Sequence, residues 1–198
     1  MKALKYYIKI MDAFSEKTGF VISWLSTLLV ITVFYDVIMR YVFKNGSIAI
    51  QELEWHIFSV IFLLGAAFTL KREGHVRVDI LYTKFSTITK AWVDLLGTFI
   101  FLIPFCVIVI YSTKLFILAS WSVREISPDP GGLPFRYALK AMVPIGFFFL
   151  ILQGTSEALK NLLVILGKNE VVLHNNDFNE KDVLQNNDFN KKEDGKKS

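Results

Sequence analysis

The chain has 198 residues, of which 53% are hydrophobic, and its formal net charge at pH 7 is +4. Its basic residues flank long apolar runs and do not gather on one polar face, so the charge does not indicate a nucleic-acid-binding protein. The single cysteine, Cys106, excludes an internal disulfide and a cysteine-based metal cluster. Almost all long apolar runs lie between residues 18 and 166, which indicates an integral membrane protein.

The first segment, residues 1–17, has an amphipathic pattern. One helical face carries Leu4, Tyr7, Ile8, Met11 and Phe14, and the opposite face carries Lys2, Lys5, Lys9, Asp12 and Glu16. This segment is too polar to span a bilayer, so we expect a helix that lies in the membrane interface with its lysines toward anionic headgroups. No cleavable signal peptide is expected, because the first apolar run is long and lacks a cleavage site after it.

Four apolar runs follow, at residues 19–43, 50–70, 91–119 and 138–166. A helix rises about 1.5 Å per residue, so about 20 apolar residues cross a hydrocarbon layer of about 30 Å. Within that layer the backbone amides find partners only inside a helix or a closed barrel. The predicted fold is therefore an all-α membrane protein with an N-terminal amphipathic helix and four transmembrane helices, which form a membrane domain over residues 18–167. Pro104 and Pro144 fall inside the third and fourth runs and predict kinks or breaks.

The basic residues also predict the orientation. Nine of them lie in the N-terminal segment and between the second and third runs, whereas three lie in the other two connections. The positive-inside rule then places both termini in the cytoplasm and the loops 44–49 and 120–137 outside. The second loop contains Gly131 and Gly132 among three prolines, which predicts a specific turn. It is either a docking or capping surface or a plain connector.

The last segment, residues 168–198, is rich in Asn, Asp, Lys and Glu. A polar motif that begins at Asn175 recurs eleven residues later, at Asn186. Two copies of a polar motif cannot bury a core, so we predict a disordered cytoplasmic tail and assign no function to it.

Ionisable residues at membrane depth require a reason, because they are costly there. Asp36 and Arg40 lie four positions apart in the first run, which favours an ion pair on one helix face. That pair is either local or reaches toward a partner protein. Glu52 and Glu54 open the second run, where the helix dipole favours acids, and His56 follows them without a second membrane histidine for haem.

In the fourth run, Gln153, Glu157 and Lys160 share one helix face, where Glu157 and Lys160 can pair and Gln153 can bond across helices. None of these groups forms an acid–base or nucleophile constellation. The sequence contains no hydrolase or phosphate-binding motif and no cluster of metal ligands. We therefore expect no catalytic, cofactor or metal site. Internal repeats and broken helices around a midplane site are also missing, which favours an accessory subunit over a complete transporter.

Six short segments follow a known pattern in order and spacing. They are Asp36–Phe43, Gln51–Glu54, Leu64–Lys71, Gly74–Asp79, Pro130–Pro134, and Gln153-Gly154 with Glu157. Through them the chain resembles the small membrane subunit, often called the Q subunit, of tripartite ATP-independent periplasmic (TRAP) transporters of the DctQ type. The sequence Gly74-His75-Val76-Arg77-Val78-Asp79 carries most of this resemblance, and the asparagine-rich tail lies outside it.

The resemblance implies a non-enzymatic scaffold subunit in the bacterial inner membrane. Its partners would be the lipid bilayer, a large membrane subunit with the transport domain and sodium sites, and a periplasmic binding protein that delivers an organic acid. It also implies uptake driven by a sodium gradient. The candidate subunit-interface or structural residues are Asp36, Arg40, Glu52, Glu54, His75, Arg77, Asp79, Gly131, Gly132, Gln153 and Glu157.

Two other classes of protein remain as alternatives. A four-helix membrane transferase would need a cluster of arginines or acids inside the bundle. A free-standing small exporter would need a membrane-embedded acid in mid-span, and Asp36 lies near one end of its run.

Overall fold

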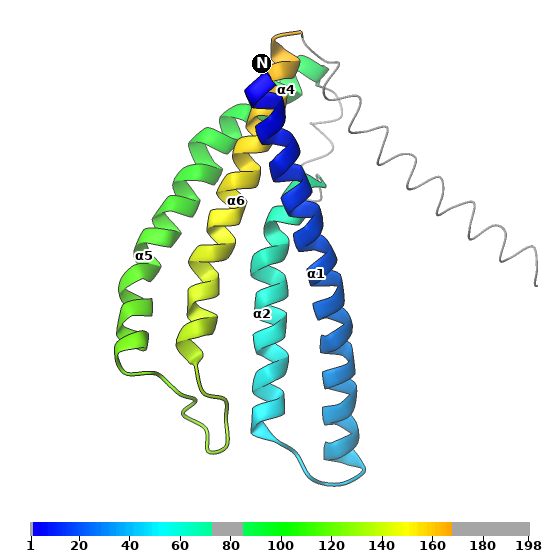
Figure 1. The fold of residues 1–198 in the computed structure, drawn as a ribbon, viewed down its shortest axis with the longest axis vertical. Coiled ribbons are helices and arrows are strands. Elements are labelled where there is room, and N and C mark those ends of the chain that lie inside the picture. The colour runs from blue at the N-terminus through cyan, green and yellow to red at the C-terminus, as the bar shows by residue number, and fades with distance from the viewer. Residues whose placement is uncertain (1, 73–84, 168–198) are drawn as a thin grey trace, which may run out of the picture.

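The computed structural model describes residues 2–72 and 85–167, and these form helices joined by loops (Figure 1). The helical elements are α1 (Lys2–Tyr41), α2 (Ile48–Lys71), α4 (Thr87–Gly97), the π-helical turn η1 (Thr98–Leu102), α5 (Ile103–Ser122) and α6 (Arg136–Ile165). Two predictions lie outside the described residues: the segment with His75, Arg77 and Asp79, and the tail 168–198.

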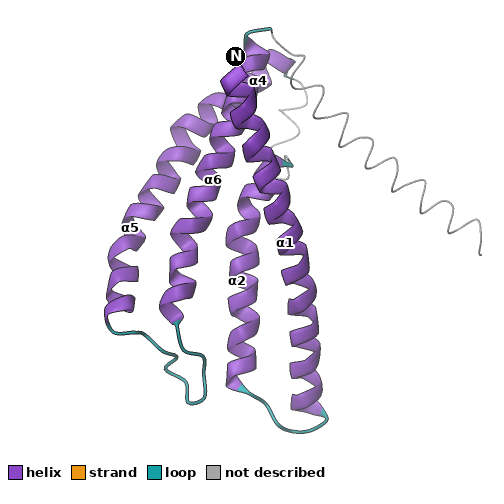
Figure 2. Cartoon of the chain, viewed as in Figure 1, coloured by secondary structure: helices purple, strands orange, loops and turns teal. Residues whose placement is uncertain are grey.

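Four helical segments are long and apolar enough to cross a membrane, which confirms the predicted fold class. They are Ala3–Tyr41, Ile48–Lys71, the continuous rod Thr87–Ser122 and Arg136–Ile165. Most of these helices extend beyond the apolar runs that predicted them, because a helix does not end where the hydrocarbon layer ends. The short loops 42–47 and 123–135 lie together at one end of the bundle, which we call the loop end (Figure 2). The start of α1 and the end of α6 lie at the opposite, terminal end.

The N-terminal segment is helical, as expected, but it is not separate from the first span. Helix α1 continues without a break through Lys17 and Gly19 over 40 residues. At about 1.5 Å per residue it measures about 60 Å, roughly twice the thickness of a hydrocarbon layer. No proline interrupts this stretch. Part of its expected polar face is in addition buried, since Asp12 is only 6% exposed.

The two prolines inside predicted spans have different outcomes. Pro104 is the second residue after the π-helical turn η1, at whose end the Ile103 N–H bonds to the Thr98 carbonyl five residues back. Proline has no N–H to donate, so a local change in the hydrogen-bond ladder beside it is expected. Pro144, in contrast, lies inside α6 without ending it.

The helices stand side by side in the order α5, α6, α2, α1 when the molecule is viewed down its shortest axis (Figure 1). Helix α6 contacts α1, α2, α4, η1 and α5, and toward the terminal end α1 leans across α2 to reach α6. Two glycines allow close approach. A Cβ at Gly146 would lie 2.7 Å from the Leu63 carbonyl oxygen of α2, and one at Gly154 would lie 2.8 Å from Leu102.

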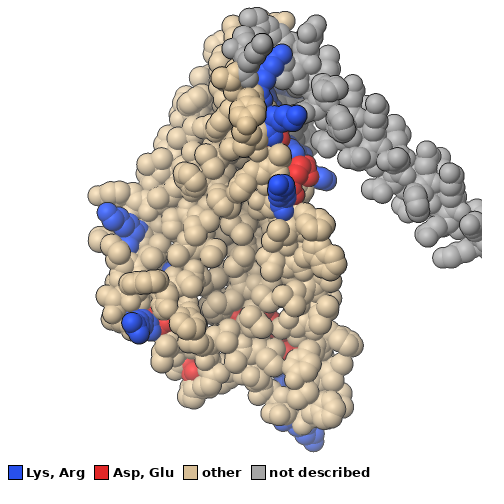
Figure 3. Space-filling model, in the orientation of Figure 1, with Lys and Arg blue, Asp and Glu red and all other residues tan. Residues whose placement is uncertain are grey.

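Such a layer buries few side chains. The buried hydrophobic residues are Ile8, Ile57, Ala67, Ala91, Cys106, Ala158 and Leu163, and an equal number of buried residues are polar: Asp12, Ser15, Asp36, Glu52, Ser120, Gln153 and Ser156. Figure 3 shows a broad uncharged surface, with charged side chains mostly toward its two ends. In lipid, apolar contact alone drives helix association weakly, so the buried polar contacts decide how the helices are arranged.

Candidate functional site

The carboxylate of Glu52 organises the loop end of the bundle. Glu52 lies in the first turns of α2 and is 4% exposed. Its Oε1 accepts hydrogen bonds from Ser127 Oγ at 2.5 Å and from Arg136 Nη2 at 3.1 Å. Its Oε2 accepts one from the backbone N–H of Leu133 at 2.5 Å. One side chain of α2 thus holds the loop 123–135 and the first residue of α6, and we call this set the Glu52 site.

The glycines of this loop are required by its path around Glu52. Gly131 has φ = 84°, a backbone conformation that glycine adopts without steric cost. A Cβ at Gly132 would lie 2.7 Å from Glu52 Oε2 and would also overlap Ser127. The loop is closed further by the hydrogen bond from the Ser127 N–H to the Leu133 carbonyl at 3.2 Å. The specific turn predicted from the sequence is therefore present.

A second cation of α6 lies beside this loop. Lys140 pairs with Glu125, and its ammonium lies 4.0 Å from the centre of the Phe116 ring. The hydrogen bond that Lys140 donates holds the pKa of the Glu125 carboxyl below its usual value. The Arg136 guanidinium also lies 5.6 Å from the centre of the Trp55 ring. Arg136 and Lys140 are thus each matched by an acid and an aromatic face of the same chain.

The pair of Asp36 and Arg40 is present as a local ion pair on α1. Asp36 is 2% exposed, and its Oδ1 has no hydrogen-bond partner among the described residues. Glu54 lies on α2 within electrostatic range of Asp36 and Arg40, and its Oε1 is likewise buried without a partner in the described part of the chain. Glu52 and Glu54 therefore have different surroundings although they are two positions apart: Glu52 holds a loop, and Glu54 bonds to no described group through that oxygen.

At the terminal end, Gln153 links α1 to α6. Its side chain is 1% exposed. Its Oε1 accepts a hydrogen bond from Ser15 Oγ at 2.6 Å, and its Nε2 donates to Glu157 Oε1 at 2.9 Å and to Asp12 Oδ1 at 3.3 Å. Lys160 Nζ lies 2.9 Å from both Asp12 and Glu157. We call these five residues the Gln153 network.

Helix α2 joins α1 near the same end. Lys71 Nζ donates to the Asp12 carbonyl at 3.1 Å and pairs with Glu16 at 2.6 Å. Tyr7 and Thr155 share a hydrogen bond of 2.8 Å between α1 and α6. The N-terminal part of α1 is thus attached to two other helices by polar contacts.

Sequence reasoning missed part of the Gln153 network. Asp12 was expected on an exposed face, and Ser15 was not singled out. The spacing of Ile8, Asp12, Ser15 and Gly19 is that of a helix–helix contact stripe and would have indicated their burial. Lys114 was also missed, although it stands alone within the apolar sequence of α5.

The predicted site residues do not come together as one site. Glu52, Gly131 and Gly132 meet at the loop end, Gln153 and Glu157 meet at the terminal end, and Asp36 with Arg40 stands apart from both. Within residues 2–72 and 85–167, no group of three or more His, Cys, Asp or Glu residues could hold a metal ion.

These features define a helical, multi-span membrane protein whose buried polar groups hold helices and a loop in place. The family model for the DctQ component of tripartite ATP-independent periplasmic transporters matches residues 29–163. The chain therefore belongs to the DctQ family and is the small membrane component of a TRAP transporter. No curated protein matches the chain.

Proposed function

We propose that this subunit is a non-catalytic frame that braces the large membrane subunit of a sodium-driven transporter. In this proposal, a periplasmic binding protein delivers an organic acid, and the large subunit carries the moving transport domain. The transporter resides in the bacterial inner membrane.

The observation that carries the proposal is that α6 is attached at both of its ends. The Gln153 network ties it to α1 at the terminal end. At the loop end, Arg136 and the preceding loop are tied to α2 through Glu52. A layer fixed at two levels resists shear between its helices, which is the property that a static support for a moving partner needs.

The loop 123–135 supports a second part of the proposal, contact with the binding protein. It is held in one conformation by Glu52, and Asp129 and Pro130 are exposed at its tip. A preformed loop loses little conformational entropy on binding. We propose that this loop faces the periplasm.

Orientation can be tested by thiol labelling, because the native Cys106 is buried. Asp129→Cys and Ser198→Cys would be treated with a membrane-impermeant maleimide in intact spheroplasts. The cysteine at 129 should label at once, and the one at 198 only after lysis. The reverse pattern would contradict the proposed topology.

The function is tested by reconstitution into proteoliposomes. The chain alone should move no solute. With the large subunit and the binding protein, a panel of radiolabelled organic acids should reveal uptake that requires an inward sodium gradient and is lost when this chain is omitted. Solute flux by the chain alone, or full flux without it, would overturn the proposal.

A further inference from the structure

Lys114 is a membrane-depth cation without a counter-charge in the described part of the chain. It lies on α5, its side chain is exposed, and it forms no hydrogen bond or ion pair with residues 2–72 or 85–167. Four other cations of the spanning helices have an acidic partner: Arg40 pairs with Asp36, Arg136 with Glu52, Lys140 with Glu125 and Lys160 with Asp12. Lys114 therefore requires a separate explanation.

Its depth follows from the two tryptophans of the same rod. Trp92 and Trp121 are 29 positions apart, which corresponds to about 43 Å and matches a bilayer of about 40–45 Å including headgroups. Lys114 precedes Trp121 by seven positions, so its Cα lies about 10 Å further into the membrane. The Cα thus lies a few ångströms inside the hydrocarbon layer, where a lysine either extends its ammonium to the headgroups or pairs with a counter-charge.

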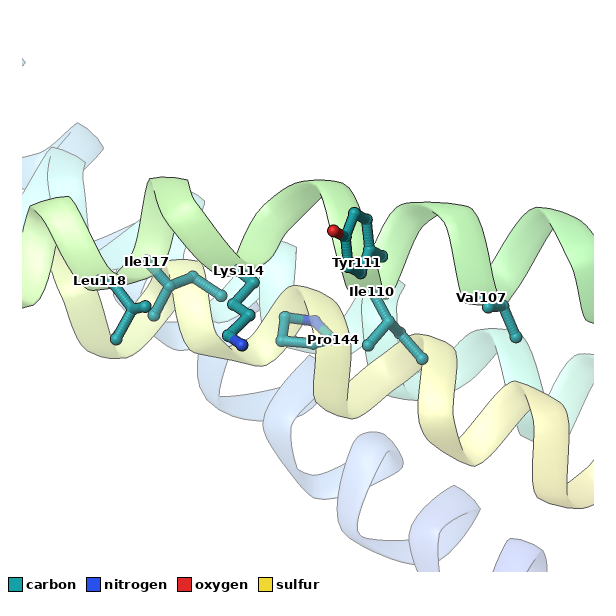
Figure 4. A pocket seen from close by; sticks show the side chains of 7 residues that line it. All are labelled: Val107, Ile110, Tyr111, Lys114, Ile117, Leu118 and Pro144. Atoms are coloured by element: carbon teal, nitrogen blue, oxygen red, sulfur yellow. The ribbon is translucent and has the colours of Figure 1, made fainter.

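Lys114 also lines a groove between α5 and α6. The groove has a volume of about 470 Å³, with Val107 and Ile110 on one side of the lysine along α5, Ile117 and Leu118 on the other, and Pro144 of α6 across from it. Figure 4 shows the lysine side chain lying across this groove beside Pro144. The remaining lining residue is Tyr111, so the lining is mostly apolar, and Lys114 supplies its one charge near the middle of its length.

We propose that a transmembrane helix of the large subunit lies along this groove and places an Asp or Glu carboxylate against Lys114. This inference rests on the proposed function and identifies the face that contacts the partner. The position of the Lys114 charge along the groove favours a helix over a phospholipid as the occupant. A phospholipid would present its phosphate at one end of an apolar groove, whereas a helix can present a carboxylate midway between apolar residues. A desolvated ion pair of this kind fixes the register of two helices.

The test compares complexes purified from cells that express this chain together with its large subunit. Lys114→Met keeps the length of the side chain and removes the charge, Lys114→Arg keeps the charge, and Leu115→Met is the control on the neighbouring, 77% exposed position. We expect Lys114→Met to raise the dissociation rate of the complex in detergent by at least about tenfold, as for loss of one partner of a buried charge pair. The arginine and control variants should behave as wild type.

Failure to fold would not obscure the result. The methionine variant loses an uncompensated charge, so the subunit alone should insert into membranes at least as well as wild type. Charge exchange gives an independent test: Lys114→Glu should dissociate rapidly, and an acid-to-lysine change at one membrane position of the large subunit should restore the complex.

Two results would overturn the inference. One is a Lys114→Met complex that dissociates at the wild-type rate. The other is a Lys114→Met complex that stays intact but has lost a bound phospholipid, as measured by native mass spectrometry. Both leave the proposed function standing, because wild type still binds the large subunit. A wild-type chain that does not co-purify with the large subunit would instead contradict the proposed function itself.

Discussion

The two ends of this bundle use buried polar groups in different ways. At the loop end, the Glu52 carboxylate binds a backbone N–H, a hydroxyl and a guanidinium from residues 75 to 84 positions away in sequence. At the terminal end, Gln153, Asp12 and Lys160 bind one another through side chains that project from two regular helices. The first arrangement gives an irregular segment its shape, and the second fixes the relative position of two helices.

The difference shows how a thin layer of helices can have one defined arrangement without a large apolar core. A helix satisfies its own backbone, so side-chain bonds are sufficient to align it with a neighbour. A loop has backbone groups that need partners, and a carboxylate can accept several of them at once. Each of the following changes tests one side of this comparison.

The largest effect is expected from Glu52→Ala. It removes the acceptor for Ser127, Leu133 and Arg136 together, so the loop 123–135 should lose its fixed conformation. We expect trypsin to cleave after the exposed Arg124 at least about tenfold faster, because cleavage follows the population of the open loop. The rate would be measured on the purified subunit in detergent.

Glu54→Ala is the matched control for that experiment. It removes the same chemical group two positions further along α2, where the Oε1 atom bonds to no described residue. Loop cleavage should then remain at the wild-type rate. Equal acceleration by both variants would mean that the loop responds to the charge of α2 and not to the Glu52 hydrogen bonds.

A smaller effect is expected from Lys160→Met at the terminal end. It leaves Asp12 and Glu157 without their shared cation, and loss of one partner from such a largely buried set should lower the free energy of unfolding by about 2 kcal/mol. Unfolding would be followed by tryptophan fluorescence during an SDS titration in mixed micelles. Loop cleavage at Arg124 should not change, because the two ends are separate.

Lys9→Met serves as the control, since Lys9 is an exposed lysine of the same helix as Asp12. Its effect should stay within about 0.5 kcal/mol, as for other surface changes. Adding Asp12→Asn to Lys160→Met should cost less than the sum of the two single changes, because the partners act as one unit. Strict additivity would show that the network is not coupled.

The smallest effect concerns acid pH and Glu125. Its hydrogen bond from Lys140 lowers the pKa of the folded carboxyl below that of the unfolded chain. The pair therefore stabilises the fold above the ordinary glutamate pKa, and this stabilisation is lost as the pH falls through that value and the lower folded one. The melting temperature of wild type should be slightly higher than that of Glu125→Gln at pH 7, and this difference should disappear toward pH 3. A gap that does not change with pH would rule out the ionised pair as its source.

The sequence predicted the helices well because their signal is local. Apolar runs of sufficient length, the prolines of the third and fourth spans and the glycines of the loop each act within a few residues. It also placed Gln153, Glu157 and Lys160 on one face of a helix, which the structure confirms. The partners Asp12 and Ser15 were not assigned to that face, because they come from a segment that looked like an independent surface helix.

By itself, the sequence determined a membrane protein with four helices long and apolar enough to span, a specific turn at residues 127–134 and ion pairs within one helix, such as Asp36 with Arg40. Only the tertiary structure decided that α1 extends over 40 residues to reach α6 and that Glu52, not Glu54, holds the loop. It also decided that Lys114 faces a groove without a counter-charge. The physical reason is that spacing along one helix fixes which residues share a face, whereas the partner of each face depends on contacts between segments far apart in the chain.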